Sequence, residues 1–86
     1  GLTMREVVGR LAKVGVVHEA AALELCTDPE FIASVGLKGE KSLEGYLFPD
    51  TYFFPKGLSP RRVLGTMVRR FIKLWKKLEP RAKTLG

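Results

Sequence analysis

Apolar residues recur at helical spacing near the start of the chain. The repeat consists of Val7, Val8, Leu11 and Val14. Positions three and four apart lie on one face of a helix, so this spacing is typical of an amphipathic helix with one buried side. Thr3 and Glu6 form a T-x-x-E capping box in front of the repeat, and Gly15 follows it. The sequence therefore predicts a first helix over residues 4–14.

Two shorter helices are expected after the first. Residues 18–26 are rich in Ala, Leu and Glu, which are strong helix formers. Asp28 can then cap a new helix, Pro29 suits its first position, and Gly36 suits its end. The sequence predicts this third helix at about residues 29–35. The polar and glycine-rich stretch that follows it is expected to be an exposed loop.

Aromatic residues dominate the next segment, residues 42–54, which reads SLEGYLFPDTYFF. Aromatic residues and threonine favour strands, and each proline disfavours helical backbone at the residue before it. Pro49 and Pro55 act in this way here. The pattern predicts two short strands, near residues 46–48 and 51–54, which would form a small two-stranded β element.

A long amphipathic helix is predicted to begin at Ser59 and Pro60, which suit its cap and its first turn. Its apolar stripe consists of Val63, Leu64, Met67, Val68, Phe71, Ile72, Trp75 and Leu78. We interpret most of this stripe as core, although part of it could be a surface meant for the remainder of a longer protein. Pro80 is expected to end the helix. The predicted fold class is mainly α with a small two-stranded β element: three short N-terminal helices, a β-hairpin-like aromatic segment and one long C-terminal helix.

Composition and charge place the chain among small soluble domains. It has 86 residues and a net charge of +6, from fifteen Lys and Arg against nine acids. Seven of the fifteen cations lie within residues 61–77. They could form a solvated helix face or a surface for an anionic partner such as nucleic acid, lipid or an acidic polymer. The single cysteine, Cys26, excludes an intramolecular disulfide and a multi-cysteine zinc site, and is expected to be a small buried residue.

No stretch approaches the roughly 20 apolar residues that a membrane-spanning helix needs, and no signal-peptide pattern opens the chain. The chain itself is therefore expected to be soluble. Its start at Gly1, with helix-capping residues directly after it, and its basic tail favour the interpretation that it is a piece of a longer protein.

Two carboxylates stand out within the aromatic segment, Glu44 and Asp50. Glu44 has Leu43, Tyr46 and Leu47 around it in the sequence, and apolar surroundings would keep a proton on a carboxyl group near neutral pH. Glu44 is therefore the first candidate for acid–base chemistry. Asp50 follows a proline and could instead accept a backbone hydrogen bond at a turn.

The ten residues LEGYLFPDTY, at positions 43–52, resemble the signature of the YceG-like family, the endolytic murein transglycosylases of the MltG type. Residues 1–36 resemble the LysM-like helical segment that precedes this signature in the family. The resemblance implies that residues 37–86 are the first part of a truncated catalytic domain. The ten-residue signature is specific, whereas the helices around it are generic.

The resemblance also implies an activity. Such an enzyme is anchored in the bacterial inner membrane, faces the periplasm or cell wall, and cleaves glycan strands of peptidoglycan to leave 1,6-anhydromuramoyl ends. Glu44 would be its catalytic acid and base, which a single carboxyl group can supply because the sugar's own 6-hydroxyl is the nucleophile. The substrate would be bound by Tyr46, Phe48, Asp50, Thr51 and Tyr52. No metal or cofactor is implied, the partners would be glycan strands and cell-wall synthesis proteins, and the membrane would be reached only through an anchor that is not in this chain.

Several alternatives remain open from the residues alone. Asp50 could hold the loop that presents Glu44, or pair with Glu44 in a hydrolase. The chain could bind glycan without cleaving it, since the family's later blocks are missing from it, and it could self-associate through its long helix. An anionic-polymer binder ranks last, and no nucleic-acid partner is expected, because no recognised motif accompanies the charge. The label aminodeoxychorismate lyase, used for some relatives, would require a Schiff-base lysine, which no lysine here suggests.

Overall fold

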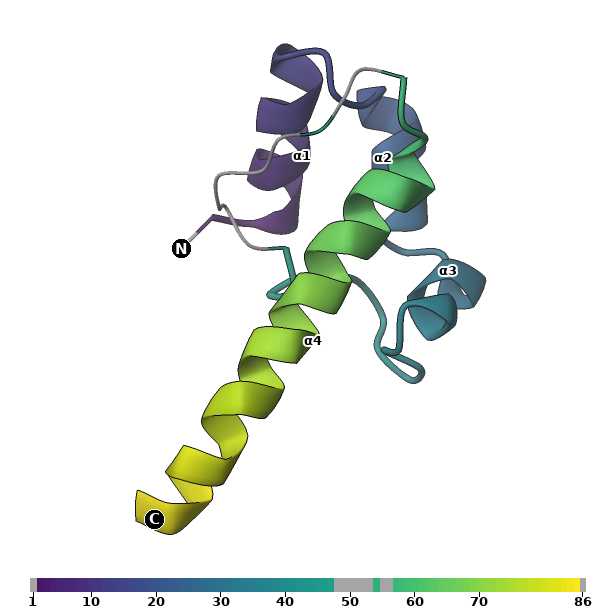
Figure 1. Cartoon of the computed structure of the whole chain (residues 1–86). Coiled ribbons are helices and arrows are strands. Elements are labelled where there is room, and N and C mark those ends of the chain that lie inside the picture. The colour runs from purple at the N-terminus through teal and green to yellow at the C-terminus, as the bar shows by residue number, and fades with distance from the viewer. Residues whose placement is uncertain (1, 48–53, 55–56, 86) are drawn as a thin grey trace.

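The computed structural model describes residues 2–47, 54 and 57–85, with side chains as far as Leu78, and this part of the chain is helical (Figure 1). Four helices follow one another in these described ranges. They are α1 (Met4–Lys13), α2 (Glu19–Leu25), α3 (Pro29–Ser34) and α4 (Pro60–Leu85). The mainly α class that the sequence predicts is therefore correct, and the first three helices lie where the sequence places them.

The helix starts confirm the capping residues read from the sequence. Thr3 Oγ1 accepts a hydrogen bond from the backbone N–H of Glu6 at 3.2 Å, and the Glu6 side chain accepts one from the backbone of Thr3, so the capping box is complete. At α3, Asp28 Oδ1 accepts from the N–H of Glu30 at 3.0 Å, and Pro29 occupies the first turn. These bonds satisfy N–H groups that have no partner within the helix.

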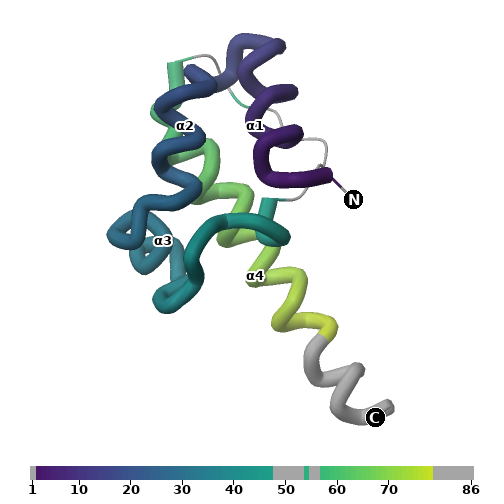
Figure 2. The backbone as a smooth tube through the Cα atoms, turned by 180° about the vertical axis from the view of Figure 1, so that it is seen from behind, coloured from purple at the N-terminus to yellow at the C-terminus, as the bar shows by residue number. Residues whose placement is uncertain are grey.

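The helices form a small bundle from which α4 extends. α2 packs against both α1 and α4, and the N-terminal half of α4 lies along the bundle (Figures 1 and 2). The C-terminal half of α4 continues away from the other helices, which gives the molecule a long dimension of 42 Å against 27 and 20 Å. No other helix in the described part of the chain therefore covers this half of α4.

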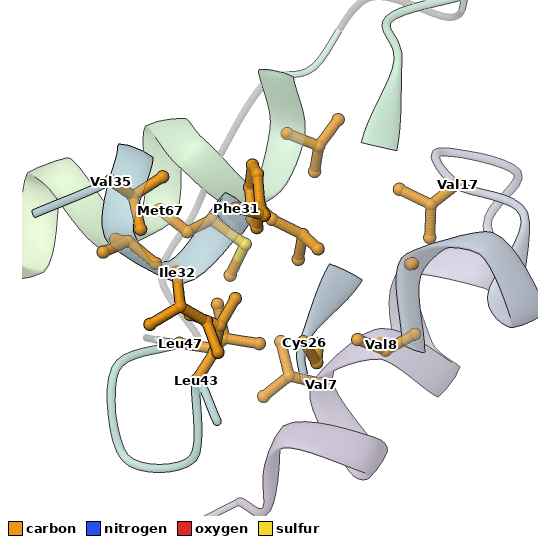
Figure 3. Packing of buried hydrophobic residues seen from close by; sticks show 14 of the residues in the cluster. Val7, Val8, Val17, Cys26, Phe31, Ile32, Val35, Leu43, Leu47 and Met67 are labelled. Atoms are coloured by element: carbon orange, nitrogen blue, oxygen red, sulfur yellow. The ribbon is translucent and has the colours of Figure 1, made fainter. Parts of the chain in front are cut away.

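The core is one hydrophobic cluster to which all four helices and the segment after α3 contribute (Figure 3). Its buried members are Val7, Val8, Val17, Ala22, Cys26, Phe31, Ile32, Val35, Leu37, Leu43, Leu47, Val63, Leu64, Met67 and Val68. The cluster takes residues from both parts of the predicted division at residue 36, and that division stays a prediction. Cys26 is fully buried, as expected of a small apolar residue.

The apolar stripe of α4 is only partly core. Met67 is buried and Phe71 is half-buried, but Trp75 is 60% exposed and Leu78 is 57% exposed. Trp75 is therefore not a core residue in this structure, and the exposure of this end of the stripe agrees with the alternative that part of the stripe is surface. The reason is geometric, because the bundle covers only the N-terminal half of the helix.

The predicted two-stranded β element is wrong for the part of the chain that the structure describes. Tyr46 belongs to a turn, and neither Leu47 nor Phe54 belongs to a strand; the remainder of both predicted strands, residues 48 and 51–53, lies outside the described residues. The backbone at the start of the segment makes other hydrogen bonds. The N–H of Leu43 binds the carbonyl of Cys26, and the N–H of Tyr46 binds the carbonyl of Leu43.

The predicted end of the last helix is also wrong, because α4 continues through Pro80 to Leu85. A proline removes one backbone donor, but it does not prevent the helix from continuing on its far side. The residues after Pro80 include Arg, Ala and Lys, which favour helix. No helix within the described residues is both long enough and apolar enough to cross a membrane.

Candidate functional site

Glu44 stands at the tip of a tight turn formed by residues 43–46. The N–H of Tyr46 donates to the carbonyl of Leu43 at 2.9 Å, which closes the turn. Gly45 has a φ of +86°, whereas Glu44 has a negative φ, so the turn has the positive φ at its third position that defines type II. This position favours glycine, because a Cβ there is strained in L-residues. The sequence Glu-Gly thus projects the glutamate side chain outward.

The turn is attached to two helices that are distant from it in sequence. The N–H of Leu43 donates to the carbonyl of Cys26, at the C-terminal cap of α2, at 2.9 Å. The N–H of Met4, in the first turn of α1, donates to Oε2 of Glu44 at 2.5 Å. Leu43 is fully buried in the core beside these contacts (Figure 3). The backbone around Glu44 is therefore fixed by α1, α2 and the core together.

The Glu44 side chain is exposed, so the predicted apolar enclosure of this carboxyl group is not observed. Its hydrogen bond to Met4 places the carboxylate at the N-terminus of α1, where the helix dipole favours negative charge. The field of Glu44 also reaches the core. Burial, and to a smaller extent the charge of Glu44, raise the pKa of the Cys26 thiol to about 11.

Tyr46 connects the turn to the loop before it and to α4. Its hydroxyl donates to Oε1 of Glu40 at 3.1 Å, and its ring meets that of Phe71 edge to face, with 5.3 Å between centroids and 79° between planes. The hydrogen bond to Glu40 raises the pKa of the Tyr46 hydroxyl, with smaller contributions from burial and from the charge of Glu40. The ring is thereby held in one orientation on the surface of α4.

A groove of about 550 Å³ lies between the turn and α4. Its described lining consists of Gly36, Leu37, Glu44, Gly45, Tyr46, Phe71, Ile72 and Trp75. Figure 2 shows the segment after α3 passing across α4. The groove thus combines one carboxylate with aromatic and aliphatic walls. Such a site suits a ligand that has both apolar surface and hydrogen-bond donors.

The structure brings together some of the predicted site residues and leaves others undescribed. Glu44 and Tyr46 line the same groove. Phe48, Asp50, Thr51 and Tyr52 lie outside the described residues. Sequence reasoning missed the contribution of α4, namely Phe71, Ile72 and Trp75. One signal in the sequence could have indicated this contribution. The apolar stripe of the last helix is longer than the stretch of helix that a domain of this size can cover, so its far end had to be exposed or bound to something else.

A second hollow, of about 600 Å³, lies on α4 and is basic. Its described lining consists of Thr66, Arg69, Arg70, Lys73, Leu74 and Lys77. Its four cations, Arg69, Arg70, Lys73 and Lys77, belong to the cationic face that the sequence predicts for the helix. Within the described residues, His, Cys, Asp and Glu side chains form no group of three that could hold a metal ion.

Comparison with known proteins identifies the relationship of the chain. None of the curated proteins and none of the solved structures compared with it matches significantly. Among protein families, the YceG-like family matches residues 1–86, which is the whole chain. This match includes the turn that carries Glu44 and the helices that hold it. The chain therefore belongs to the YceG-like family.

Proposed function

We propose that the chain forms part of a lytic transglycosylase of the MltG type, with Glu44 as its catalytic acid and base. Such an enzyme cleaves the glycan strands of peptidoglycan internally and leaves 1,6-anhydromuramoyl ends. The observation that supports this most is the position of Glu44 on a hydrogen-bonded turn at the edge of an aromatic-walled groove. Membership of the YceG-like family supports the same activity.

The proposed reaction needs one carboxyl group and no water. Glu44 in its protonated form donates a proton to the glycosidic oxygen while the bond from that oxygen to the muramoyl C1 breaks. The resulting carboxylate then takes the proton of the 6-hydroxyl of the same sugar as its oxygen bonds to C1. The proton returns to Glu44, so the products together have the composition of the substrate. Because the nucleophile is tethered to the reacting sugar, the second step is effectively intramolecular.

The surroundings of Glu44 would contribute orientation. The N–H of Met4 engages one carboxylate oxygen, and a carboxyl group needs only one oxygen to carry the transferred proton. The turn and the buried Leu43 restrict the backbone, so the carboxyl group would meet the glycan from a defined direction. An aromatic wall on α4 would hold the sugar ring opposite it.

A second candidate is a glycan-binding module without catalytic activity. The exposure of Glu44 favours it, because a general acid is usually kept protonated by less polar surroundings than these. The two candidates share their ligand, but only the transglycosylase would release cleavage products. Both would act on the outer side of the cytoplasmic membrane, where peptidoglycan lies.

The test is digestion of purified peptidoglycan by the natural full-length protein and by its Glu44→Gln variant, with products identified by mass spectrometry. We expect anhydro ends from the unmodified protein and a loss of about 10²-fold to 10⁴-fold in the variant, the usual contribution of general acid–base catalysis. The glutamine oxygen can still accept the hydrogen bond from Met4, so the variant should fold.

Glu24→Gln is the matched control, because Glu24 is an exposed acid on α2 outside the groove. It should cleave at the unmodified rate. Reducing ends in place of anhydro ends would indicate a hydrolase, with Asp50 as the partner to examine next. Glycan binding without cleavage by the unmodified protein would refute the catalytic proposal in favour of the binding module.

A further inference from the structure

Trp75 combines high exposure with a place in the wall of the groove. Its side chain is 60% exposed, although tryptophan is a large apolar residue that proteins usually cover for the most part. It lines the same groove as Glu44 and Tyr46. Phe71, four residues earlier, lies one helical turn away on the same side of α4 and holds Tyr46 edge to face. The aromatic surface of the groove therefore continues from the turn along α4.

We propose that Trp75 is a stacking platform for a pyranose ring of the glycan, forming a subsite beside the one at Glu44. This inference rests on the proposed function, since it takes the groove to be the glycan site. Pyranose rings carry polar hydroxyls at their edges and axial C–H groups on their faces, and these faces pack on aromatic rings. The glycan strand would run from Glu44 along α4 toward its C-terminal half.

The charge of the groove favours a glycan over other occupants of an exposed apolar surface. Glu44 lines the same groove as Trp75, and its carboxylate can accept hydrogen bonds from sugar hydroxyls. An anionic lipid headgroup would instead meet the negative charge of Glu44. The cations of α4 that could attract such a lipid, Arg69, Lys73 and Lys77, line the separate basic hollow.

Trp75 is the only tryptophan in the chain, so intrinsic fluorescence reports on this side chain alone. The experiment titrates soluble peptidoglycan glycan fragments, freed of peptide, into the Glu44→Gln variant of this 86-residue chain, which should bind without cleaving. We expect a saturable shift of the emission to shorter wavelength, because stacking on a sugar ring removes water from the indole. Titration with phosphatidylglycerol vesicles and dilution of the protein alone are run in parallel.

Calorimetric titration of the same fragments then measures affinity in three further variants. In the Glu44→Gln background, Trp75→Ala should weaken binding at least roughly tenfold, whereas Trp75→Phe, which keeps an aromatic face, should lose much less. Leu78→Ala is the matched control, because Leu78 is equally exposed on α4 and does not line the groove. It should leave affinity unchanged.

Three results would overturn the subsite. The first is glycan binding that neither moves the emission nor weakens in Trp75→Ala, and this result would leave the catalytic proposal intact. The second is a shift seen with vesicles and absent with glycan, which would mean a lipid-binding surface. The third is a shift that depends on protein concentration alone, which would mean that Trp75 contacts a second copy of the chain. Failure of the catalytic proposal is read separately, from the absence of cleavage products.

Discussion

Cys26 links the core to the candidate site at the scale of single residues. Its side chain is fully buried, and its carbonyl accepts the hydrogen bond that holds Leu43 and thus the turn of Glu44. Burial and the charge of Glu44 both disfavour the thiolate and raise the pKa of the thiol to about 11, from 9.0 for the free side chain. A thiol in this state is a poor nucleophile, so Cys26 is structural.

The raised pKa of Cys26 predicts how stability changes at alkaline pH. Below about pH 9 the thiol is protonated in both the folded and the unfolded chain, so its contribution to the free energy of unfolding is fully present. Between about pH 9 and 11 only the unfolded chain loses the proton, so the free energy of unfolding falls as pH rises, by roughly 2–3 kcal/mol in total. Urea unfolding followed by circular dichroism at several pH values measures this fall.

Cys26→Ala isolates the contribution of the thiol. The variant should be less stable at neutral pH, because it leaves a small cavity, but its stability should decline less steeply above pH 9. All other ionisable groups, including Tyr46 with its raised pKa, are present in both proteins and cancel in the comparison. Parallel curves for the two proteins would show that the thiol keeps its ordinary pKa in the fold.

At the scale of elements, the turn at residues 43–46 depends on the backbone of Gly45. An alanine there must adopt a φ near +86°, which is unfavourable for an L-residue even though nothing lies within 4 Å of the added Cβ. We expect Gly45→Ala to destabilise the protein by about 1–2 kcal/mol. The strain falls on the turn that presents Glu44, so cleavage of peptidoglycan should decrease more than stability alone would explain.

Gly9→Ala is the matched comparison. Gly9 lies inside α1 with helical backbone, and its added Cβ would have only an ordinary contact, at 3.7 Å from the Glu19 carboxylate. Alanine is a better helix former than glycine by up to about 1 kcal/mol, so this variant should be neutral or stabilised. The thermal unfolding temperature should fall in Gly45→Ala and should stay the same or rise in Gly9→Ala. Equal shifts would mean that the turn does not need its positive φ.

The elements differ in how well the sequence predicts them, and the difference is physical. Helix starts are specified by neighbouring residues, so the box at Thr3 and Glu6 and the cap at Asp28 were readable directly. The turn at Glu44 is held by contacts with residues far away in the chain. The hydrogen bond from Met4 to Glu44 spans forty positions, and no local pattern encodes it. The strand prediction was wrong because it weighed the local preference of aromatic residues without these contacts.

At the scale of the whole molecule, the sequence does not predict which apolar side chains of α4 are buried and which are exposed. The apolar stripe from Val63 to Leu78 is continuous in the sequence, and periodicity alone gives every position in it the same expectation. The structure divides it, with Val63 buried and Trp75 exposed, because the other helices end partway along α4. The same division leaves Trp75 at the groove.

Because the molecule is small, a single core substitution beside Glu44 should disrupt both the fold and the candidate site. For 86 residues, a stability of roughly 4–13 kcal/mol is typical. Leu43 is among the largest fully buried side chains and directly precedes Glu44, so Leu43→Ala should cost about 2–5 kcal/mol. Leu78→Ala, the same substitution at an exposed position, should stay within about 0.5 kcal/mol. Chemical denaturation of both variants measures the difference. Equal losses of stability in the two variants would contradict the placement of Leu43 in the core, and with it the anchoring of the Glu44 turn. A large loss in Leu43→Ala alone would mean that the packing that holds the helices together also holds the turn.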